Sequence, residues 1–239
     1  MATKQTEGSG VHGRLDPALL DRANIAYWRA VAVAAEAGGL ANAARHLHHY
    51  LDNSGSDLWL DLDLLEATCP VFARNVQDAR GLAAEEARAH LDASGSAAPI
   101  RWVGDPVEYS GADSYFTKGE CADWFYAVGG NTHRAQVECV FVPGGADGGG
   151  TIEISLTWSF FDRYNWDGGK AVTIAGVTVN DEVLGRLHAV GLAREFDIKG
   201  ERTEEFSLAV GEHGSMDPIA VGSRVGSREY PDVASRERR

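Results

Sequence analysis

Cysteine, basic residues and long apolar runs are all scarce in this sequence. Three cysteines occur in 239 residues, and 22 Lys and Arg stand against 35 Asp and Glu, which gives a net charge of −13. An odd number of cysteines without a CxxC pair argues against a disulfide framework, so reduced, buried thiols are expected. The negative charge repels phosphates and anionic membrane surfaces, and nucleic acid is therefore not an expected partner.

No run of about 18 apolar residues is present, so no transmembrane segment is predicted. The first residues, MATKQTEGSG, lack the basic start and the apolar centre of a secretory signal peptide. We therefore expect the chain to be cytoplasmic as synthesised and to be exported, if at all, by a non-classical route. Of the three cysteines, Cys121 and Cys139 would form a disulfide only if their predicted strands paired.

Helical patterns fill the first part of the chain, after a polar lead at residues 1–14 that is expected to be disordered. Asp16 and Pro17 favour a helix start, because an acceptor at the N-cap and a preset φ stabilise the first turn. The helices predicted after this start cover residues 19–37, 40–51 and 71–91. Residues 57–65 alternate Leu with Asp, which fits either a strand or the start of a helix.

Beyond Ala97, glycine, aromatic and β-branched residues replace the alanine-rich pattern. The clearest signal is Ile152–Phe160, where apolar and polar residues alternate with the period of a half-buried strand. A Gly-rich loop at 143–150 would join this strand to one at 136–142 as a hairpin. Further strands are predicted at 124–130, 171–179, 196–198 and 206–210, with a charged turn between the last two and a helix after the N-cap Asn180.

These patterns predict an α+β fold, in which a helical N-terminal half precedes a mainly antiparallel β-sheet with one packed helix. The expected organisation is a disordered lead, a helical sub-domain, a β-rich sub-domain and a flexible tail, at residues 1–14, 15–96, 97–212 and 213–239.

A polar segment, DRYNWDGGK, follows the central strand, and functional groups are often held on such a loop by a rigid strand. Asp162 and Asp167 are candidate oxygen ligands for Mg²⁺, while Arg163 and Lys170 would contact phosphate and Tyr164 would donate a hydrogen bond. A divalent metal with cationic side chains is what phosphoryl chemistry needs. The other interpretation is a tight polar turn, in which Asp162 pairs with Arg163 or caps the backbone.

Around FDRYNWDGGK, the sequence resembles the signature of the colicin M-like bacteriocins: Asp-x-Tyr-Asp, five further residues, then His-Arg. Asp162 and Tyr164 fall on this motif, whereas Asn165, Ala171 and Val172 stand where the family has Asp, His and Arg. With the later GRLHAVGLAREFDIKG, the segment is also similar to C-terminal modules of bacterial polymorphic toxins.

The resemblance implies a magnesium-dependent phosphodiesterase that cuts the lipid-linked peptidoglycan precursor. The expected function is then an antibacterial toxin or effector module acting on a phosphate-bearing envelope substrate, with an immunity or carrier protein as a further partner. Asp162, Arg163 and Tyr164 would form the catalytic site, Asp162 and Asp167 would bind Mg²⁺, and His188 or His133 would replace the missing base. Loss of a base typically costs about 10²–10⁴-fold in rate.

Two other functions remain open. The first is a non-catalytic binding or structural module, in which aromatic residues of the β-rich half bind a protein or small ligand or simply fill the core. Those residues are Trp102, Tyr109, Tyr115, Phe116, Trp124, Phe125 and Tyr126. The second is a metal-dependent hydrolase with a ligand face of His46, His49 and Asp52, three residues apart on a helix.

Overall fold

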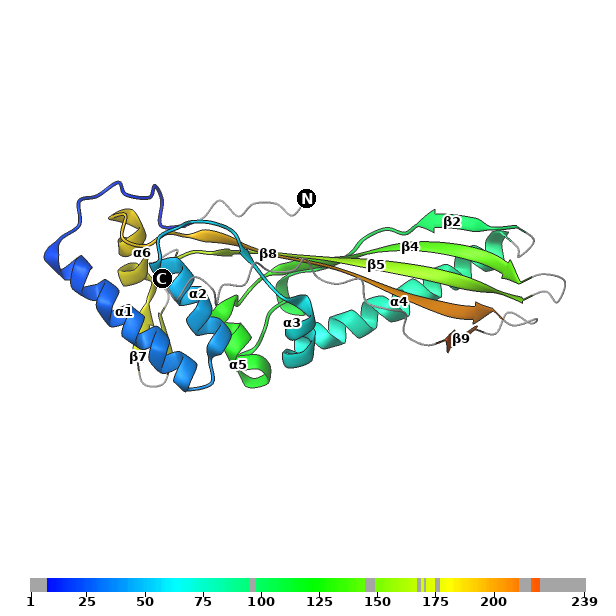
Figure 1. Ribbon diagram of the computed structural model, residues 1–239, viewed down its shortest axis with the longest axis horizontal. Helices are drawn as coiled ribbons and strands as arrows, with labels where there is room; N and C mark the ends of the chain where they lie inside the picture. The colour runs from blue at the N-terminus through cyan, green and yellow to red at the C-terminus, as the bar shows by residue number, and fades with distance from the viewer. Residues whose placement is uncertain are drawn as a thin grey trace, which may run out of the picture.

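The computed structural model describes residues 8–94, 98–144, 149–166, 169, 171–174, 177–210 and 216–219. Its fold is α+β, as predicted, with helices mostly in the N-terminal part and strands mostly in the C-terminal part. Most of the helices gather at one end of an elongated molecule, and the long strands run from there to the other end with helix α4 (Pro70–Ser94) beside them (Figure 1). Residues 1–7, the hairpin tip at 145–148 and most of the expected tail lie outside the described residues.

The first two helices are α1 (Leu19–Ala37) and α2 (Ala41–Leu51), which pack together across a turn at Gly38 and Gly39, as predicted. Helix α1 begins two residues after Pro17, because the Asp21 carboxylate accepts a hydrogen bond from the Ala18 N–H (2.8 Å) at the first turn. The ambiguous stretch at 57–65 contains both elements: strand β1 (Leu58–Trp59) and the start of helix α3 (Leu62–Thr68), capped by Asp61. Helix α4 (Pro70–Ser94) follows directly.

The main sheet has the strand order β1-β8-β5-β4-β2, with β3 also paired to β4 and β9 to β8. Only the pairing of β1 with β8 is parallel among the described strands. The predicted hairpin is present and longer than expected, and β9 lies inside the stretch expected to be a flexible tail. The other strands of this sheet are β2 (Ile100–Val103), β3 (Val107–Tyr109), β4 (Thr132–Gly144), β5 (Gly149–Tyr164), β8 (Phe196–Val210) and β9 (Met216–Ile219).

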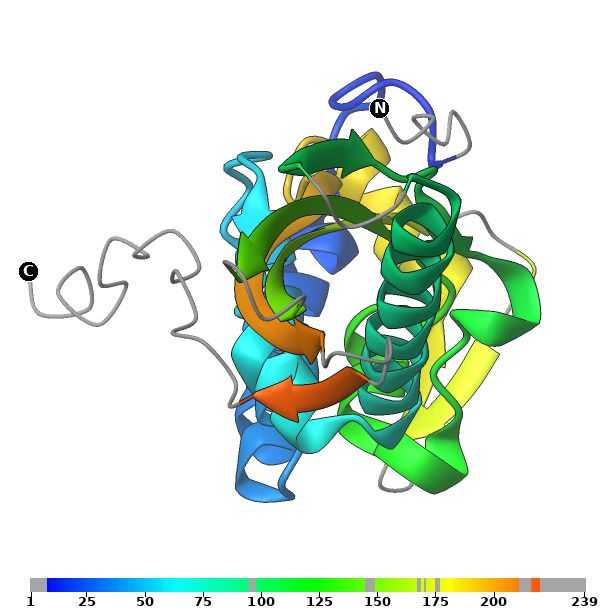
Figure 2. The same ribbon diagram turned by 90° about the vertical axis from the view of Figure 1, so that its right-hand side faces the viewer.

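The sheet curves around helix α4, which fills its concave inner face (Figure 2). The apolar residues of β5 from Ile152 to Phe160 are buried on this face, and Phe72 of α4 packs its ring 5.5 Å from that of Trp158. The outer face carries the alternate polar residues. One hydrophobic cluster joins buried residues from both predicted sub-domains, so the helical and β-rich parts share a core.

Two predicted elements are wrong. Residues 124–130 were expected to form a strand, but helix α5 (Lys118–Ala127) covers most of them, because Thr117 caps it by accepting the Glu120 N–H. The C-terminal half thus contains a second helix, which packs against α2 and α4. Cys121 lies on α5 and not on a strand beside Cys139, so the strand pairing on which a Cys121–Cys139 disulfide would depend is not present.

The expected turn between 198 and 206 is instead the middle of the single strand β8. Arg202 and Glu204 point to the inner face of the sheet and are buried there. Arg202 contacts Glu66 (2.6 Å), and Glu204 contacts Arg80 (2.5 Å), so helices α3 and α4 supply opposite charges. Because buried charges persist when they are paired and hydrogen-bonded, a charged sequence continues as a strand here.

A smaller hairpin of β6 (Ala171–Ile174) and β7 (Val177–Asn180) leads into helix α6 (Asp181–Ala189). Asn180 caps this helix as predicted, accepting the Glu182 N–H (2.8 Å). Part of the lead expected to be disordered lies against the end of α6: the N–H groups of Gly13 and Leu15 donate to His188 O (3.1 Å) and Ala189 O (2.9 Å). These bonds correct the expectation for residues 9–14.

Candidate functional site

The exit of β5 carries three of the residues predicted to act together, and the strand separates them onto two faces. Asp162 and Tyr164 follow Phe160 on the inner face, and both are buried. Arg163 lies between them and faces outward, where its register partner on β8 is Asp197. Successive side chains of a strand point to opposite sides, which explains the separation. The predicted catalytic residues therefore do not form one cluster.

Asp162 is a buried carboxyl with a local role. Its Oδ1 accepts a hydrogen bond from the Arg163 backbone N–H (2.7 Å), as the polar-turn interpretation expected, but Asp162 lies within strand β5 and not in a turn. Burial raises the pKa of Asp162 to about 8. The carboxyl is then largely protonated at neutral pH, and Mg²⁺ binds ionised carboxylates.

Tyr164 lies in an aromatic cluster between the sheet and helix α2. Its ring stacks on Phe196 at a centroid distance of 4.9 Å, with Tyr50 at 5.8 Å and His46 at 6.2 Å. Burial and the nearby Asp162 raise the pKa of the Tyr164 hydroxyl. The side chain thus contributes to the core, and its hydroxyl is a neutral group at physiological pH.

Arg163 is paired with two carboxylates, that of Asp197 on β8 and that of Glu195 in the turn before β8. Its Nη1 lies 2.6 Å from Asp197 Oδ1, and its Nη2 lies 3.9 Å from Glu195 Oε2. The Arg163 side chain is 22% exposed, whereas that of Glu195 is 3% exposed. Two acidic partners offset the guanidinium charge that was predicted to contact phosphate.

His188 joins Arg163 in the same region. The Glu195 backbone N–H donates to His188 Nδ1 (3.1 Å), so the proton is on Nε2, which donates to Gly10 O (2.9 Å). Burial lowers the pKa of His188, against the opposing effect of Glu195, which favours the neutral ring. Both ring nitrogens are therefore engaged, and the lone pair that a general base needs already accepts a hydrogen bond.

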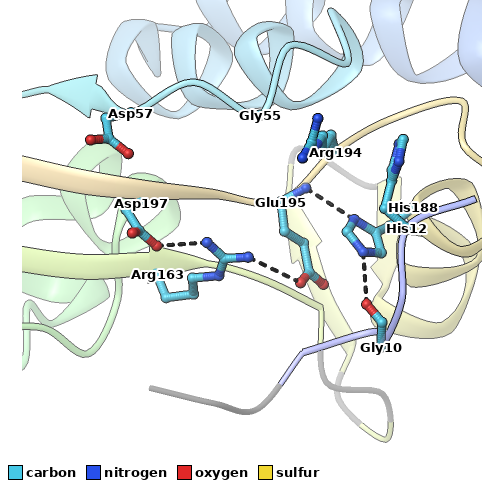
Figure 3. A pocket seen from close by; sticks show the side chains of 9 residues that line it. All are labelled: Gly10, His12, Gly55, Asp57, Arg163, His188, Arg194, Glu195 and Asp197. Atoms are coloured by element: carbon cyan, nitrogen blue, oxygen red, sulfur yellow. Dashed lines mark hydrogen bonds and ion pairs between the residues drawn. The ribbon is translucent and has the colours of Figure 1, made fainter. Parts of the chain in front are cut away.

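A polar pocket of about 360 Å³, here called the Glu195 pocket, lies where the lead, the exit of β5 and the start of β8 meet. Figure 3 shows Arg163 directed toward both Asp197 and Glu195 and the ring of His188 bonded to Gly10. Glu195 Oε1 also accepts from the backbone N–H of Ser9 (2.8 Å) and of Trp166 (3.3 Å). The lining residues are Gly10, His12, Gly55, Asp57, Arg163, His188, Arg194, Glu195 and Asp197.

A second pocket of about 460 Å³, here called the outer-face hollow, lies on the sheet beside the Glu195 pocket and shares Asp197 with it. The strand register places Phe161 of β5 beside Lys199 of β8, and Lys199 beside Trp59 of β1. Two half-buried aromatic side chains are thus surrounded by hydroxyl and charged groups. The lining residues are Trp59, Glu108, Thr132, His133, Arg134, Ser159, Phe160, Phe161, Asp197, Lys199, Gly200 and Glu201.

The residues predicted to bind Mg²⁺ do not form a donor set in the part of the chain that is described. Asp162 is the buried carboxyl above, while Asp167 and the predicted phosphate ligand Lys170 lie outside the described residues. Within the described ranges, no group of three or more His, Cys, Asp or Glu side chains is arranged to hold a metal ion. The described residues therefore do not fit the magnesium site that the resemblance implies.

The three residues of the alternative metal face on α2, His46, His49 and Asp52, each bind a different partner. His46 is buried, and its Nδ1 donates to Ala127 O (2.9 Å). His49 Nε2 donates to Ser56 O (2.8 Å), and Asp52 pairs with Arg29 at 3.2 Å. These bonds leave the three side chains without a common point at which a cation would bind.

His133, the other candidate base, belongs to the aromatic core. The Asn75 side chain donates a hydrogen bond to His133 Nε2 (2.9 Å), and His133 Nδ1 donates one to Asn131 Oδ1 (2.9 Å). The ring of Phe160 lies parallel to the imidazole. Burial lowers the pKa of His133 to about 3. Of the aromatic residues considered as the lining of a ligand pocket, most are buried in the hydrophobic core: Trp102, Tyr109, Phe116 and Trp124.

The sequence predictions missed Glu195, Asp197, His12 and the two aromatics of the outer-face hollow. A strand over 196–198 was predicted, and its period would have put Asp197 on the face opposite to Phe196. The partner strand was the missing information, since only the register of β5 on β8 brings Arg163 to Asp197.

No family model matches this chain, and searches of curated proteins and of solved structures likewise found no match. Among the described residues, no helix is both long enough and apolar enough to cross a membrane. The resemblance to colicin M-like enzymes and to polymorphic toxin modules stays a prediction.

Proposed function

We propose that this chain is a binding module whose ligand lies in the outer-face hollow and extends toward the Glu195 pocket. The observation that carries the proposal is the placement of Phe161 and Trp59 on the polar side of the sheet, in a hollow of about 460 Å³. Aromatic side chains with one half-exposed face supply apolar contact area at small entropic cost. Binding sites combine such surfaces with a few polar groups that orient the ligand.

The charges around the hollow favour a neutral, hydroxyl-rich ligand such as an oligosaccharide. Its lining has three acidic side chains, Glu108, Asp197 and Glu201, and two basic ones, Arg134 and Lys199. Donors and acceptors are therefore both present, without the excess of cations that recognition of a polyphosphate requires. The hydroxyls of Thr132 and Ser159 add short polar contacts on the same face. A net charge of −13 further disfavours anionic ligands.

The continuity of the two pockets supports an extended ligand. Asp197 lines both of them, and Asp57 of the Glu195 pocket pairs with Lys199 of the outer-face hollow at 2.5 Å. Several sugar units in a row would contact the aromatics at one end and the polar groups around Arg194 at the other.

The magnesium-dependent phosphodiesterase has less support. Asp162 and Tyr164 are buried, and Arg163 is paired with two carboxylates. It stays a prediction, tested by incubating the protein and its Asp162→Ala variant with lipid-linked peptidoglycan precursor and Mg²⁺. Release of the phosphorylated headgroup by the wild type alone would restore it.

The binding function is tested by titrating the protein with chitotetraose and cellotetraose while tryptophan fluorescence and binding heat are recorded. We expect saturable binding of at least one oligosaccharide, and a loss of affinity of about 30-fold or more in Phe161→Ala, since hot-spot aromatics contribute about 2 kcal/mol or more.

Val142→Ala is the matched control, because Val142 is an exposed apolar residue of β4 near the opposite end of the sheet. Its affinity should equal that of the wild type. No binding of either oligosaccharide, or equal affinity for wild type and Phe161→Ala, would overturn the proposal.

A further inference from the structure

Two of the three cysteines meet at the junction of α3, α4 and α5. Cys69 is the single residue between α3 and α4, and Cys121 lies within α5. Their Sγ atoms are 2.8 Å apart, and both side chains are buried. Carbon atoms in ordinary packing contact are roughly 3.5–4.0 Å apart, and a disulfide bond is about 2.05 Å long. The two thiols are therefore closer than packing requires.

The backbone at both cysteines departs from helical geometry. Cys69 has φ −120° and ψ 102°, and Cys121 has φ −150° and ψ 70° in the middle of a helical segment. In a regular helix, the direction of the Cys121 side chain would be set by its position in the helical repeat. The kink instead directs it to the α3–α4 junction, where Cys69 lies.

Two contacts near the sulfur atoms hold α5 against the junction of α3 and α4. Trp124 Nε1 donates to Thr68 Oγ1 (2.8 Å), and Arg74 pairs with Glu120 at 2.8 Å. Each contact joins α5 to a residue within five positions of Cys69 in the chain. These contacts keep Cys69 and Cys121 beside each other in the folded chain.

We propose that Cys69 and Cys121 form a disulfide bond when this chain folds in an oxidising environment. A low-molecular-weight disulfide such as oxidised glutathione is the oxidant. One cysteine thiolate attacks it and forms a mixed disulfide, releasing one glutathione thiol, and the second cysteine then displaces the other glutathione. The two protein thiols lose two protons and two electrons in total, and the oxidant is reduced to two thiols.

The bond forms during folding, and the folded state then protects it. Burial raises the pKa of the Cys121 thiol to about 12, so the reduced folded chain holds little of the reactive thiolate. Burial of both residues also keeps external disulfides and thiols away from the sulfur atoms. Cys139, buried on β4 opposite Ile154, stays a thiol.

The proposal is tested by refolding the reduced chain in a glutathione redox buffer and counting thiols after denaturation. We expect one thiol per chain, with peptide mapping that joins the segments containing Cys69 and Cys121. The Cys139→Ala variant should keep the bridge and retain no thiol, whereas Cys69→Ser should retain two. Three thiols in the refolded wild type, or a bridge to Cys139, would overturn the proposal.

Thermal unfolding provides a second measurement that does not depend on thiol chemistry. The oxidised wild type and the oxidised Cys139→Ala variant should each unfold at a higher temperature than their reduced forms, because the cross-link restricts the unfolded chain. The double variant Cys69→Ser/Cys121→Ser should unfold at the same temperature in both buffers. Equal midpoints for the oxidised and reduced wild type would count against the bond. Neither the thiol count nor the thermal unfolding involves the outer-face hollow. Both measurements therefore test the disulfide independently of the proposed function.

Discussion

Arg163 on β5 and Asp197 on β8 are register partners, and their side chains form an ion pair of 2.6 Å. On the opposite face of the same two strands, Tyr164 stacks on Phe196. These contacts join the two segments that stand out in the sequence, FDRYNW and REFDIK. The segments are two sides of one strand pair, with a charged contact outside and an aromatic contact inside.

The first prediction concerns Arg163. Replacing it in Arg163→Gln removes the charge next to Glu195, whose side chain is 3% exposed, and removes the bond to Asp197. We expect the free energy of unfolding to fall by about 1–3 kcal/mol, since hydrogen bonds between charged, partly buried groups are worth that much. Urea unfolding followed by circular dichroism measures the change.

Arg88→Gln is the control for this variant, because Arg88 and Asp92 form an exposed pair at 3.9 Å on α4. An exposed pair of this kind contributes about 0–1 kcal/mol. If the two variants lost the same small amount of stability, Arg163 would not be a structural residue.

The second prediction concerns the pH dependence of stability at Asp162. The pKa of this carboxyl is raised to about 8 by burial, and its value in the unfolded chain is about 3.9. Between these values the folded state holds a proton that the unfolded state has released, so the contribution of Asp162 to stability is greatest at low pH and falls as the pH rises. Asp162→Asn removes this dependence.

We therefore expect wild-type stability to fall, relative to that of Asp162→Asn, when urea unfolding is compared at about pH 5 and about pH 8. Asp92→Asn, which alters an exposed carboxylate on α4, should follow the wild type. A constant difference between wild type and Asp162→Asn over this range would show that Asp162 does not titrate there.

The third prediction concerns the buried charges inside the sheet. Arg202 has no exposed side-chain surface, and its Nη1 lies 2.6 Å from Glu66 and 3.1 Å from Asp63. Arg202→Met removes the shorter ion pair of Glu66 and keeps its longer one, to Arg80 at 3.2 Å. Breaking a buried pair in this way costs about 3–5 kcal/mol, which urea unfolding would measure.

Arg101→Met is the comparison for this variant, since the pair of Arg101 and Glu138 is on the surface. Its loss should be at most about 1 kcal/mol. A loss as small as this for Arg202→Met would mean that Arg80 alone neutralises the buried carboxylates.

Local signals predicted much of the fold. Helices α1, α2, α4 and α6 follow from apolar spacing and from end residues such as Gly38 and Asn180, which act within a few positions of themselves. The central hairpin follows from the alternation that begins at Ile152. Helix α5 was missed because Trp124, Phe125 and Tyr126 favour strands, although Thr117 and Glu120 have the spacing of a capping box.

The remaining features depend on contacts between distant residues. Arg202 and Glu204 interrupt the apolar alternation of β8, and only their pairing with residues of α3 and α4 makes a strand there stable. The candidate site has the same dependence. From the residue types, Arg163 was predicted to act together with its sequence neighbour Asp162. In the structure, the strand register places Arg163 beside Asp197 instead.

Strand β8 is paired with β5 along its whole length, from Phe196 opposite Tyr164 to Val210 opposite Gly150. These strands run along the longest dimension of the molecule (Figure 1). Tension applied along that direction, at opposite ends of the two strands, would load their hydrogen bonds together in shear instead of opening them one after another. We therefore expect the fold to resist tension along this axis better than a pull across the sheet, which would open the hydrogen bonds one after another.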